Sequence, residues 1–359
     1  MFYNKIEYVE IELTSRCNAA CPQCVRNDHG GKTWHTLPIV DINFDVLTSA
    51  LKPIADTVKL VRLCGTYGDP CIYKQLIDVV DWVHENTQAK IVINTNASMR
   101  TIKWWKTLAE HLKENDLVYF GIDGLEDTHH LYRRGTDYNR IIRNLTTFNQ
   151  AGGKSVWAFL VFEHNQHQVD EANRLSQELG CTDFSWKSTT RFIDKTHRLI
   201  DKSPVLDNKG KIVYWLHPVT DQRWINSGYQ RIDNTLKKYG NQENFLRNTK
   251  INCVAQSVNM IHISAEGYLM PCGWLADRFY GVETENHPDH NKLFGMINAS
   301  GGFDKININH NSIKDIVEGQ FFQDLLTSWQ SSVRLDRCAN QCSHEHSMTS
   351  TSWVGVDIL

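Results

Sequence analysis

Cys17, Cys21 and Cys24 lie close together near the N-terminus and are the residues of this sequence best placed to do chemistry. They follow residues 8–13, whose alternation of apolar and polar side chains is typical of a half-buried strand. A loop leaving the end of a strand can bring three sulfur atoms to one point. Three thiolates are one fewer than usually hold an iron–sulfur cluster. A cluster bound here without a fourth protein ligand would leave one iron open for a substrate or cofactor.

The Cys-x3-Cys-x2-Cys spacing after a first strand resembles that of the radical S-adenosylmethionine (SAM) superfamily. In that family the cysteines hold a 4Fe-4S cluster, and the amine and carboxylate of SAM chelate its open iron. The resemblance implies that SAM is cleaved to methionine and a 5′-deoxyadenosyl radical, which abstracts a hydrogen atom from a substrate. Three simpler interpretations of the thiols stay open: a zinc site completed by a distant histidine, a redox pair, and buried structural thiols.

Residues 1–190 contain six strand-like runs that alternate with helical patterns. Such alternation predicts a parallel α/β sheet with right-handed crossovers. Six units are too few for a closed eight-stranded barrel, and the resemblance implies a partial (β/α)6 TIM-like barrel. In parallel barrels the chemistry lies at the C-terminal ends of the strands, so we expect the cysteine loop there. The runs span residues 8–13, 58–63, 90–94, 117–122, 156–162 and 184–186.

The second run is followed by Gly65-Thr-Tyr-Gly-Asp-Pro70. A bent turn is expected here, because Pro70 has no N–H group and Gly68 tolerates unusual backbone dihedrals. The segment resembles the Gly-Gly-Glu-Pro motif of radical SAM enzymes, with Tyr67 and Asp69 in place of Gly and Glu. The resemblance implies that Gly68 and Asp69 meet the amine of SAM. An ordinary turn between a strand and a helix is the alternative.

The third run ends in Asn94-Thr-Asn96, which resembles the Thr-Asn-Gly segment of the family and implies that Asn96 contacts SAM. Asn165, just past the fifth run, is a weaker candidate for the adenosine pocket.

The fourth run leads into residues 121–135, which resemble a Ser-Ile-Asp-Gly…Tyr-Arg-Gly segment of the family with Gly121 at the serine position. This likeness implies that Asp123 faces the SAM ribose. It also implies that Arg133, or its neighbour Arg134, pairs with the SAM carboxylate through a bidentate fork. Solvated charges at the start of a helix are the alternative.

Cys253, Cys272, Cys338 and Cys342 form a second set of thiols. The first two bracket a strand pattern, a turn at residues 266–267 and a returning strand, which predicts a β-hairpin that brings its ends together. Cys338 and Cys342 can lie on one face of a helix. Four thiols suit either a 4Fe-4S cluster or a zinc ion.

The hairpin segment resembles the opening of the SPASM domain, the auxiliary-cluster domain of many peptide-modifying radical SAM enzymes. Because this chain has cysteines for one such cluster only, it looks more like the single-cluster version called twitch. The resemblance implies an auxiliary 4Fe-4S domain over residues 251–359, joined to the barrel by a connector over residues 191–250. His344 and His346 lie near Cys342 and are alternative ligands. Isolated cysteines are interpreted as buried packing residues. They are Cys64, Cys71 and Cys181.

The composition restricts the class of protein. The 38 basic and 41 acidic residues give a formal net charge of −3, which indicates no nucleic-acid or membrane-surface partner. No apolar run approaches the ~20 residues of a membrane span. The N-terminus lacks the basic and apolar regions of a signal peptide, so we expect a cytoplasmic protein. In a reducing compartment, ten cysteines indicate metal binding or catalysis rather than disulfides.

Together these features predict a radical SAM enzyme that modifies or oxidises a peptide or protein side chain. It would use SAM, two 4Fe-4S clusters and an electron donor such as flavodoxin or ferredoxin. Oxidation of a small molecule, as in an aminocyclitol dehydrogenase of the superfamily, is the alternative. A two-cluster electron carrier that binds no SAM is the non-enzymatic alternative. Asp277, five residues past Cys272, is the candidate base for the proton lost when a carbon radical is oxidised.

Overall fold

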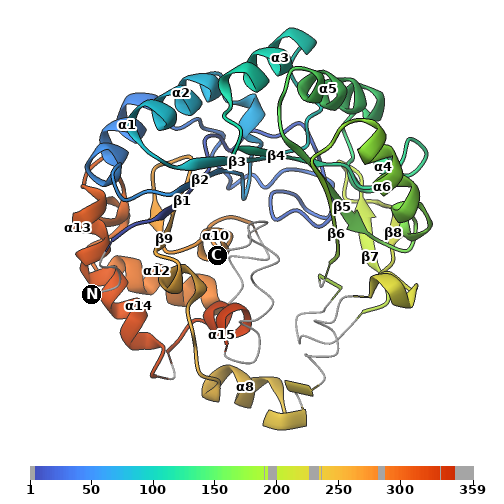
Figure 1. The fold of residues 1–359 in the computed structure, drawn as a ribbon. Coiled ribbons are helices and arrows are strands. Elements are labelled where there is room, and N and C mark those ends of the chain that lie inside the picture. Colours follow the sequence, from blue (N-terminus) through green and yellow to red (C-terminus); the bar gives the residue numbers. More distant parts are fainter. Residues whose placement is uncertain are drawn as a thin grey trace.

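A computed structural model describes residues 5–189, 191–192, 200–225, 234–235, 237–281, 288–331 and 333–343. Its centre is a curved eight-stranded sheet in the order β10-β9-β1-β2-β3-β4-β5-β6 (Figure 1). All neighbours from β1 to β6 are parallel, which confirms the predicted α/β partial barrel. The predicted runs differ from these strands by up to two residues at an end. The strands are β1 (Tyr8–Ile11), β2 (Leu60–Leu63), β3 (Lys90–Thr95), β4 (Leu117–Gly121), β5 (Ser155–Val161) and β6 (Asp183–Ser188).

Helices that follow the parallel strands cover the convex side of the sheet (Figure 1). Their N-terminal N–H groups are capped by short polar side chains, Asn43 for α1, Thr101 for α3 and Asp137 for α5. The apolar face of each helix packs on the sheet, and its polar face meets solvent. The helices of this half are α1 (Phe44–Leu51), α2 (Leu76–Asn86), α3 (Ile102–His111), α4 (His129–Tyr132), α5 (Tyr138–Gln150) and α6 (Val169–Glu178).

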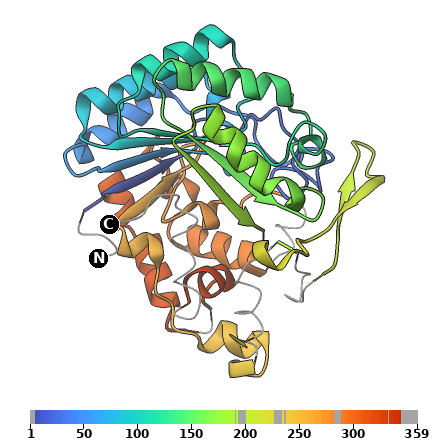
Figure 2. The same ribbon diagram turned by 45° about the vertical axis from the view of Figure 1, so that its right-hand side comes forward.

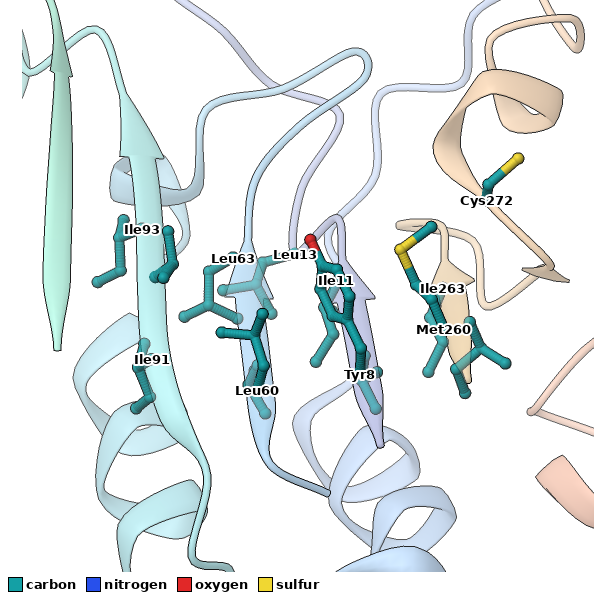
Figure 3. Packing of buried hydrophobic residues seen from close by; sticks show 14 of the residues in the cluster. Tyr8, Ile11, Leu13, Leu60, Leu63, Ile91, Ile93, Met260, Ile263 and Cys272 are labelled. Carbon is teal, nitrogen blue, oxygen red and sulfur yellow. The ribbon is translucent and has the colours of Figure 1, made fainter. Parts of the chain in front are cut away.

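The core beneath these helices consists of β-branched and aliphatic residues that lie opposite one another in the sheet. Ile11 pairs in register with Leu63 on one side and with Ile263 on the other. Figure 3 shows these side chains as one continuous packed layer. Strands buried in this way are typical of parallel sheets covered by helices. Trp105 of α3 closes the layer against Phe120 of β4, with ring centroids 5.2 Å apart.

A hairpin from the C-terminal part of the chain extends the same sheet, with β9 (Met260–Ile263) parallel to β1 and β10 (Leu269–Met270) antiparallel to β9. The hairpin was predicted, whereas its pairing with β1 was not. Side chains alternate between the faces of a strand, so Glu10, Arg62 and His262 share the face opposite to Ile11. That face is the concave side of the sheet.

The remaining C-terminal helices lie below the sheet in Figure 2. The segment expected as a connector contains a separate antiparallel pair, β7 (Ser203–Leu206) and β8 (Ile212–Leu216). None of the helices in the described segments has the length and apolar character needed to cross a membrane. The helices are α8 (Gln242–Asn248), α9 (Val254–Ser257), α10 (Gly273–Ala276), α12 (Pro288–Ala299), α13 (Ile313–Glu318), α14 (Gln320–Ser328) and α15 (Asp336–Cys342).

We expect Trp105→Ala to lower the free energy of unfolding by about 3–5 kcal/mol, because it leaves a cavity between α3 and the sheet. Trp104→Ala is the matched control, since the neighbouring ring is only partly buried and should cost clearly less. Urea unfolding of both variants measures the difference. Equal losses would show that Trp105 does not hold α3 on the sheet.

Candidate active site and second cysteine cluster

The loop between β1 and α1 carries the first three cysteines and is folded back by short hydrogen bonds. The N–H of Cys24 donates to the carbonyl of Cys21 at 3.0 Å, and the N–H of Ala19 donates to the sulfur of Cys17 at 3.4 Å. Cys21 is buried, whereas Cys17 and Cys24 are partly exposed. Apolar side chains from the α4 region, the β5 end, the segment after β6 and the β7–β8 pair cover one side of the loop. They are Tyr132, Phe162, Phe192, Val205 and Leu216.

A cavity of about 500 Å³ connects the cysteine loop with solvent on its other side. Cys17 contributes to its wall, so the loop is accessible without opening the barrel. The residues that line it are Arg16, Cys17, Arg26, Thr33, Trp34, His35, Leu37 and Ile39.

The electrostatics of the three thiols test whether they suit a metal cluster. Burial raises the pKa of Cys21 to about 12, although the nearby Arg133 lowers it. Burial, Asp69 and the other two cysteines raise the pKa of Cys17 as well, which shows that the three thiols are close enough to interact. With their pKa values raised, the thiols of Cys17 and Cys21 stay neutral unless a positive metal centre holds them as thiolates. They therefore fit an iron–sulfur cluster.

Arg133 reaches this loop from the end of α4. Its Nη1 lies 4.0 Å from the sulfur of Cys21, and its Nε donates to Asp123 at 2.5 Å. Burial by itself lowers the pKa of Arg133, but Asp123 and Cys21 raise it, so the guanidinium is charged. Arg134 instead donates to the carbonyls of Gly30 and Leu206. Of the two candidates, Arg133 is therefore the one beside the cysteines.

Gly121 makes room for this guanidinium. A Cβ atom at residue 121 would lie 2.4 Å from Nη2 of Arg133. The absence of the serine expected from the family segment thus has a steric reason, since any side chain here would push Arg133 away from Cys21.

The turn of residues 65–70 lies directly against the cysteine loop. A Cβ on Gly68 would lie 1.7 Å from the carbonyl oxygen of Thr14, so only glycine fits this approach. The N–H of Asp69 donates to the carbonyl of Arg16 at 2.8 Å. The N–H groups of Tyr67 and Gly68 both donate to the carboxylate of Glu12, at 2.5 and 2.9 Å.

Glu12 belongs to the site, although no sequence motif marks it. It is 1% exposed, and burial raises its pKa to about 7. Its place in the alternating run 8–13 looked like a solvent-facing strand position. The buried turn that it supports lies more than fifty residues further along the chain.

Asp69 joins two neighbouring strand ends through the hydrogen bonds of its carboxylate. Its carboxylate accepts hydrogen bonds from the N–H of Cys71, the hydroxyl of Thr95 and the N–H of Asn96. Burial raises its pKa. These bonds tie the end of β2 to the end of β3 and bring the amide of Asn96 to 3.7 Å from the sulfur of Cys17.

Asp123 and Asn165 are both fully buried and engaged. The second carboxylate oxygen of Asp123 accepts from the N–H of Leu160 at 2.6 Å. The amide of Asn165 bonds the backbone of Asp123, Leu160 and Phe162. Both side chains therefore join the ends of β4 and β5, and their direct contact with SAM stays a prediction.

Lys187 on the inner face of β6 adds positive charge to this end of the barrel. It pairs in register with Leu160, and its side chain reaches solvent. Desolvation of the ammonium group lowers the pKa of Lys187 to about 8, and the positive charges of Arg191 and Arg62 contribute to this shift. No motif marked this lysine in the sequence.

All four cysteines of the second set line one pocket, as predicted from their spacing. The pocket lies between α10, α14 and α15, and Figure 3 shows Cys272 at the start of α10, beside β9. Burial and the neighbouring thiols raise the pKa values of Cys272 and Cys338. A hydrogen bond with Cys342 raises the pKa of Cys253 and lowers that of Cys342.

Four thiols on one pocket, two of them buried and two partly exposed, fit a metal centre. In residues 5–343, apart from the short gaps in the described chain, no group of three or more Cys, His, Asp or Glu residues is arranged to hold a single ion. The ligands of one zinc ion would have to converge at about 2.3 Å from the metal, whereas a four-iron cluster is larger. His344 and His346 lie outside the described residues.

Asp277 follows α10 and is engaged by two guanidiniums. It forms an ion pair with Arg337, next to Cys338, and lies 3.3 Å from Nε of Arg278. The carboxylate thus ties α10 to α15, and its use as a base stays a prediction. Of the isolated cysteines, Cys71 is buried, Cys64 donates to Glu10, and Cys181 packs partly buried.

Comparison with known proteins assigns the barrel. Residues 11–175 match the model of the radical SAM superfamily. The chain contains a radical SAM domain. This domain includes the cysteine loop, the turn of residues 65–70 and Arg133, which the structure brings to one place.

Two curated relatives match part of the radical SAM domain. The tungsten-containing aldehyde ferredoxin oxidoreductase cofactor-modifying protein of Pyrococcus furiosus is 31% identical over 124 residues, 33% of this chain and 32% of that protein. An uncharacterized protein of Methanocaldococcus jannaschii is 28% identical over 126 residues, 34% of this chain and 40% of that protein. The similarity thus spans well under half the length of either relative.

A solved structure, native anSMEcpe with bound AdoMet, shares the fold over most of both chains. The TM-score is 0.53 at 14% identity, and the match covers 94% of this chain and 89% of that one. The same protein with bound AdoMet and the Kp18Cys peptide gives a TM-score of 0.52. At this identity the likeness concerns the fold.

We expect Gly121→Ala to destabilise the protein by about 2 kcal/mol, because its Cβ displaces Arg133 from the buried Asp123. Gly295→Ala is the matched control. Nothing lies within 4 Å of a Cβ there, and residue 295 is inside α12, so this change should stabilise by about 0.5–1 kcal/mol. Thermal unfolding of the two variants compares them, and a neutral Gly121→Ala would contradict the packing described.

A second expectation concerns Glu12. Because its pKa rises from 4.5 in the unfolded chain to about 7 in the folded protein, the folded state holds the proton more tightly. The associated stability is fully present below pH 4.5 and is lost as the pH rises through 7. Glu12→Gln keeps the acceptor oxygen and cannot titrate. Between pH 5 and 7.5 the wild type should therefore lose on the order of 2 kcal/mol relative to the variant. Urea midpoints measured at both pH values test this, and parallel pH profiles would contradict it.

Proposed function

We propose that this protein is an enzyme that cleaves SAM reductively and abstracts a hydrogen atom from a substrate. The observation that carries the proposal is the convergence of Cys17, Cys21, Asn96 and Arg133 at the C-terminal ends of the parallel strands. Cys17, Cys21 and Cys24 would hold a 4Fe-4S cluster, which when bound supplies the electron for SAM cleavage and one open iron for SAM.

The residues around the cysteines would bind and orient SAM. The guanidinium of Arg133 forms an ion pair with the carboxylate of Asp123, and its Nη1 faces Cys21. It is suited to the SAM carboxylate. The turn with Gly68 and Asp69 brings backbone groups next to Cys17 for the SAM amine. Asp69, Asp123 and Asn165 would position these contacts through the buried hydrogen bonds that join neighbouring strand ends.

For the pocket of Cys253, Cys272, Cys338 and Cys342 we propose an auxiliary 4Fe-4S cluster. Its four thiols would occupy all four irons, so this cluster would have no open position for SAM. A cluster without an open position is compatible with two roles, that of an electron acceptor after hydrogen abstraction and that of a structural centre. This part of the proposal covers residues 251–359 as an auxiliary-cluster region of the twitch type.

The substrate class that we propose is a peptide or protein side chain. It is supported by the fold shared with a protein that was solved with AdoMet and a peptide bound. A small molecule is the second candidate, because the Pyrococcus relative is named as a cofactor-modifying protein. Deuterium transfer from labelled candidates into 5′-deoxyadenosine separates the two classes. Transfer from a peptide supports our choice, and transfer only from a small molecule contradicts it.

The division of the cysteines gives a direct prediction. Anaerobically reconstituted protein should carry about 8 iron per chain and release 5′-deoxyadenosine and methionine on reduction with SAM. Replacing Cys17, Cys21 and Cys24 by Ala should remove about half of the iron and all cleavage. Replacing Cys338 and Cys342 should also remove about half, yet leave cleavage measurable at saturating SAM.

Cys181→Ala is the matched control, because that thiol belongs to neither set and should change neither quantity. Iron assays and product chromatography measure the outcome. If the triple variant kept full iron and SAM cleavage, the first site would be assigned wrongly. Zinc in the second site would keep the assignment of the first and exclude electron transfer through the second.

A further inference from the structure

Tyr67 is the position where the turn of residues 65–70 departs from the family motif, and the structure shows where its side chain goes. The ring is 4% exposed and points away from the cysteine loop toward the C-terminal part of the chain. Its hydroxyl donates to the carbonyl of Ala276 at 3.1 Å. The ring meets that of Tyr280 edge-on, with centroids 5.4 Å apart.

Ala276 is the last residue of α10, whose N-cap is Cys272. This single helical turn therefore begins at Cys272 of the second site and ends at Ala276, the residue that the hydroxyl of Tyr67 contacts. It lies on the concave side of the sheet (Figure 1), where a Cβ on Gly273 would lie 2.8 Å from the carboxylate of Glu10. Confinement between the sheet and the second site means that a shift of Cys272 cannot leave Ala276 in place.

The next residue extends the link to the other ligands of the second site. Asp277 pairs with Arg337, which directly precedes Cys338 in α15. The N–H of Arg337 in turn donates to Asp289 of α12. The end of α10 and the start of α15 are thus joined beside Ala276, the residue that Tyr67 contacts.

The backbone of Tyr67 is held from the opposite side by the first site. Its N–H donates to Glu12, and its carbonyl accepts from Arg26 at 2.8 Å, a residue two positions after Cys24. Arg26 also donates to the carbonyl of Ser15. One residue therefore has its main chain fixed by the cysteine loop and its side chain fixed by α10.

We propose that Tyr67 is a positioning residue through which the second cysteine site sets the affinity of the first for SAM. Without a metal centre, Cys272 and Cys338 lose their common anchor, α10 is released, and the turn at Gly68 and Asp69 loses its support. Loading the second site restores it. The proposal rests on the proposed function, since it assumes that this turn binds SAM.

Coupling between two sites is reciprocal, so SAM should also order α10. This gives two independent measurements on fully loaded protein, both separate from turnover. The first is the equilibrium affinity for SAM. The second is amide hydrogen exchange in residues 272–281 with and without SAM.

The test compares Tyr67→Phe with Tyr280→Phe, each reconstituted to the iron content of the wild type. Both remove a hydroxyl from the same aromatic pair, but that of Tyr280 bonds Glu266 instead of α10. Equilibrium dialysis with labelled SAM should give a dissociation constant about fivefold higher for Tyr67→Phe. Tyr280→Phe should match the wild type.

Cys338→Ala/Cys342→Ala should weaken SAM binding as Tyr67→Phe does, and adding Tyr67→Phe to it should weaken binding no further. In the exchange experiment, which needs no cysteine replacement, SAM should protect residues 272–281 in the wild type and in Tyr280→Phe. That protection should be absent in Tyr67→Phe.

Unchanged SAM affinity and unchanged protection in Tyr67→Phe would overturn the coupling while leaving SAM binding itself intact. The proposal would also be overturned if the tyrosine and cysteine replacements each raised the dissociation constant for SAM and their effects multiplied in the combined variant. A wild type that binds no SAM at all would instead contradict the proposed function, on which the coupling rests.

Discussion

Strand β1 forms parallel pairs on both sides, with β2 from the next unit and with β9 from the C-terminal part of the chain. The rest of the architecture depends on this double pairing. It places the loop with the first three cysteines and the hairpin that leads to Cys272 on adjacent strands. Without it the two thiol sets would belong to separate units, and α10 would have no surface to lie on.

A buried ion pair reinforces the pairing on the concave side. His262 of β9 is fully buried and lies 3.0 Å from the carboxylate of Glu10, whose side chain is 16% exposed. Burial by itself would raise the pKa of Glu10, but the hydrogen bond and charge of His262 lower it to about 2. Such a pair is weak as a source of stability, yet removing one partner is costly. It therefore specifies which strand lies beside β1.

Buried carboxylates organise the site in the same way. Glu12 holds the turn of residues 65–70, Asp69 joins that turn to β3, and Asp123 holds Arg133. Each is surrounded by N–H donors or a guanidinium, so the side chains around the cysteines are in place before SAM arrives. Preorganisation of this kind reduces the entropy lost on binding.

The sequence was sufficient for the features that depend on local patterns. The alternation of strands and helices gave the parallel barrel, and cysteine spacing gave the two thiol sets that the structure brings together. The strand-end motifs located Asn96 and Arg133, because parallel strands bring their C-terminal ends to one rim.

Features that depend on distant packing could not be read in this way. The pairing of β9 with β1 joins residues about 250 positions apart, and no local signal encodes it. Glu12 looked like an outward-facing strand residue. Tyr67 looked like a simple departure from a motif until its contact with Ala276 was seen. Asp277 was a candidate base by its distance from Cys272, and its ion pair with Arg337 had no signal in the sequence.

The central claim is that the first cysteine site leaves one iron open for SAM. Electron–nuclear double resonance on the reduced protein, with SAM labelled by ¹⁵N at its amine, tests it most directly. The account predicts a hyperfine coupling to ¹⁵N that persists when Cys338 and Cys342 are replaced and disappears when Cys17, Cys21 and Cys24 are replaced. Intact reduced clusters that show no coupling to the label in the wild type would contradict it.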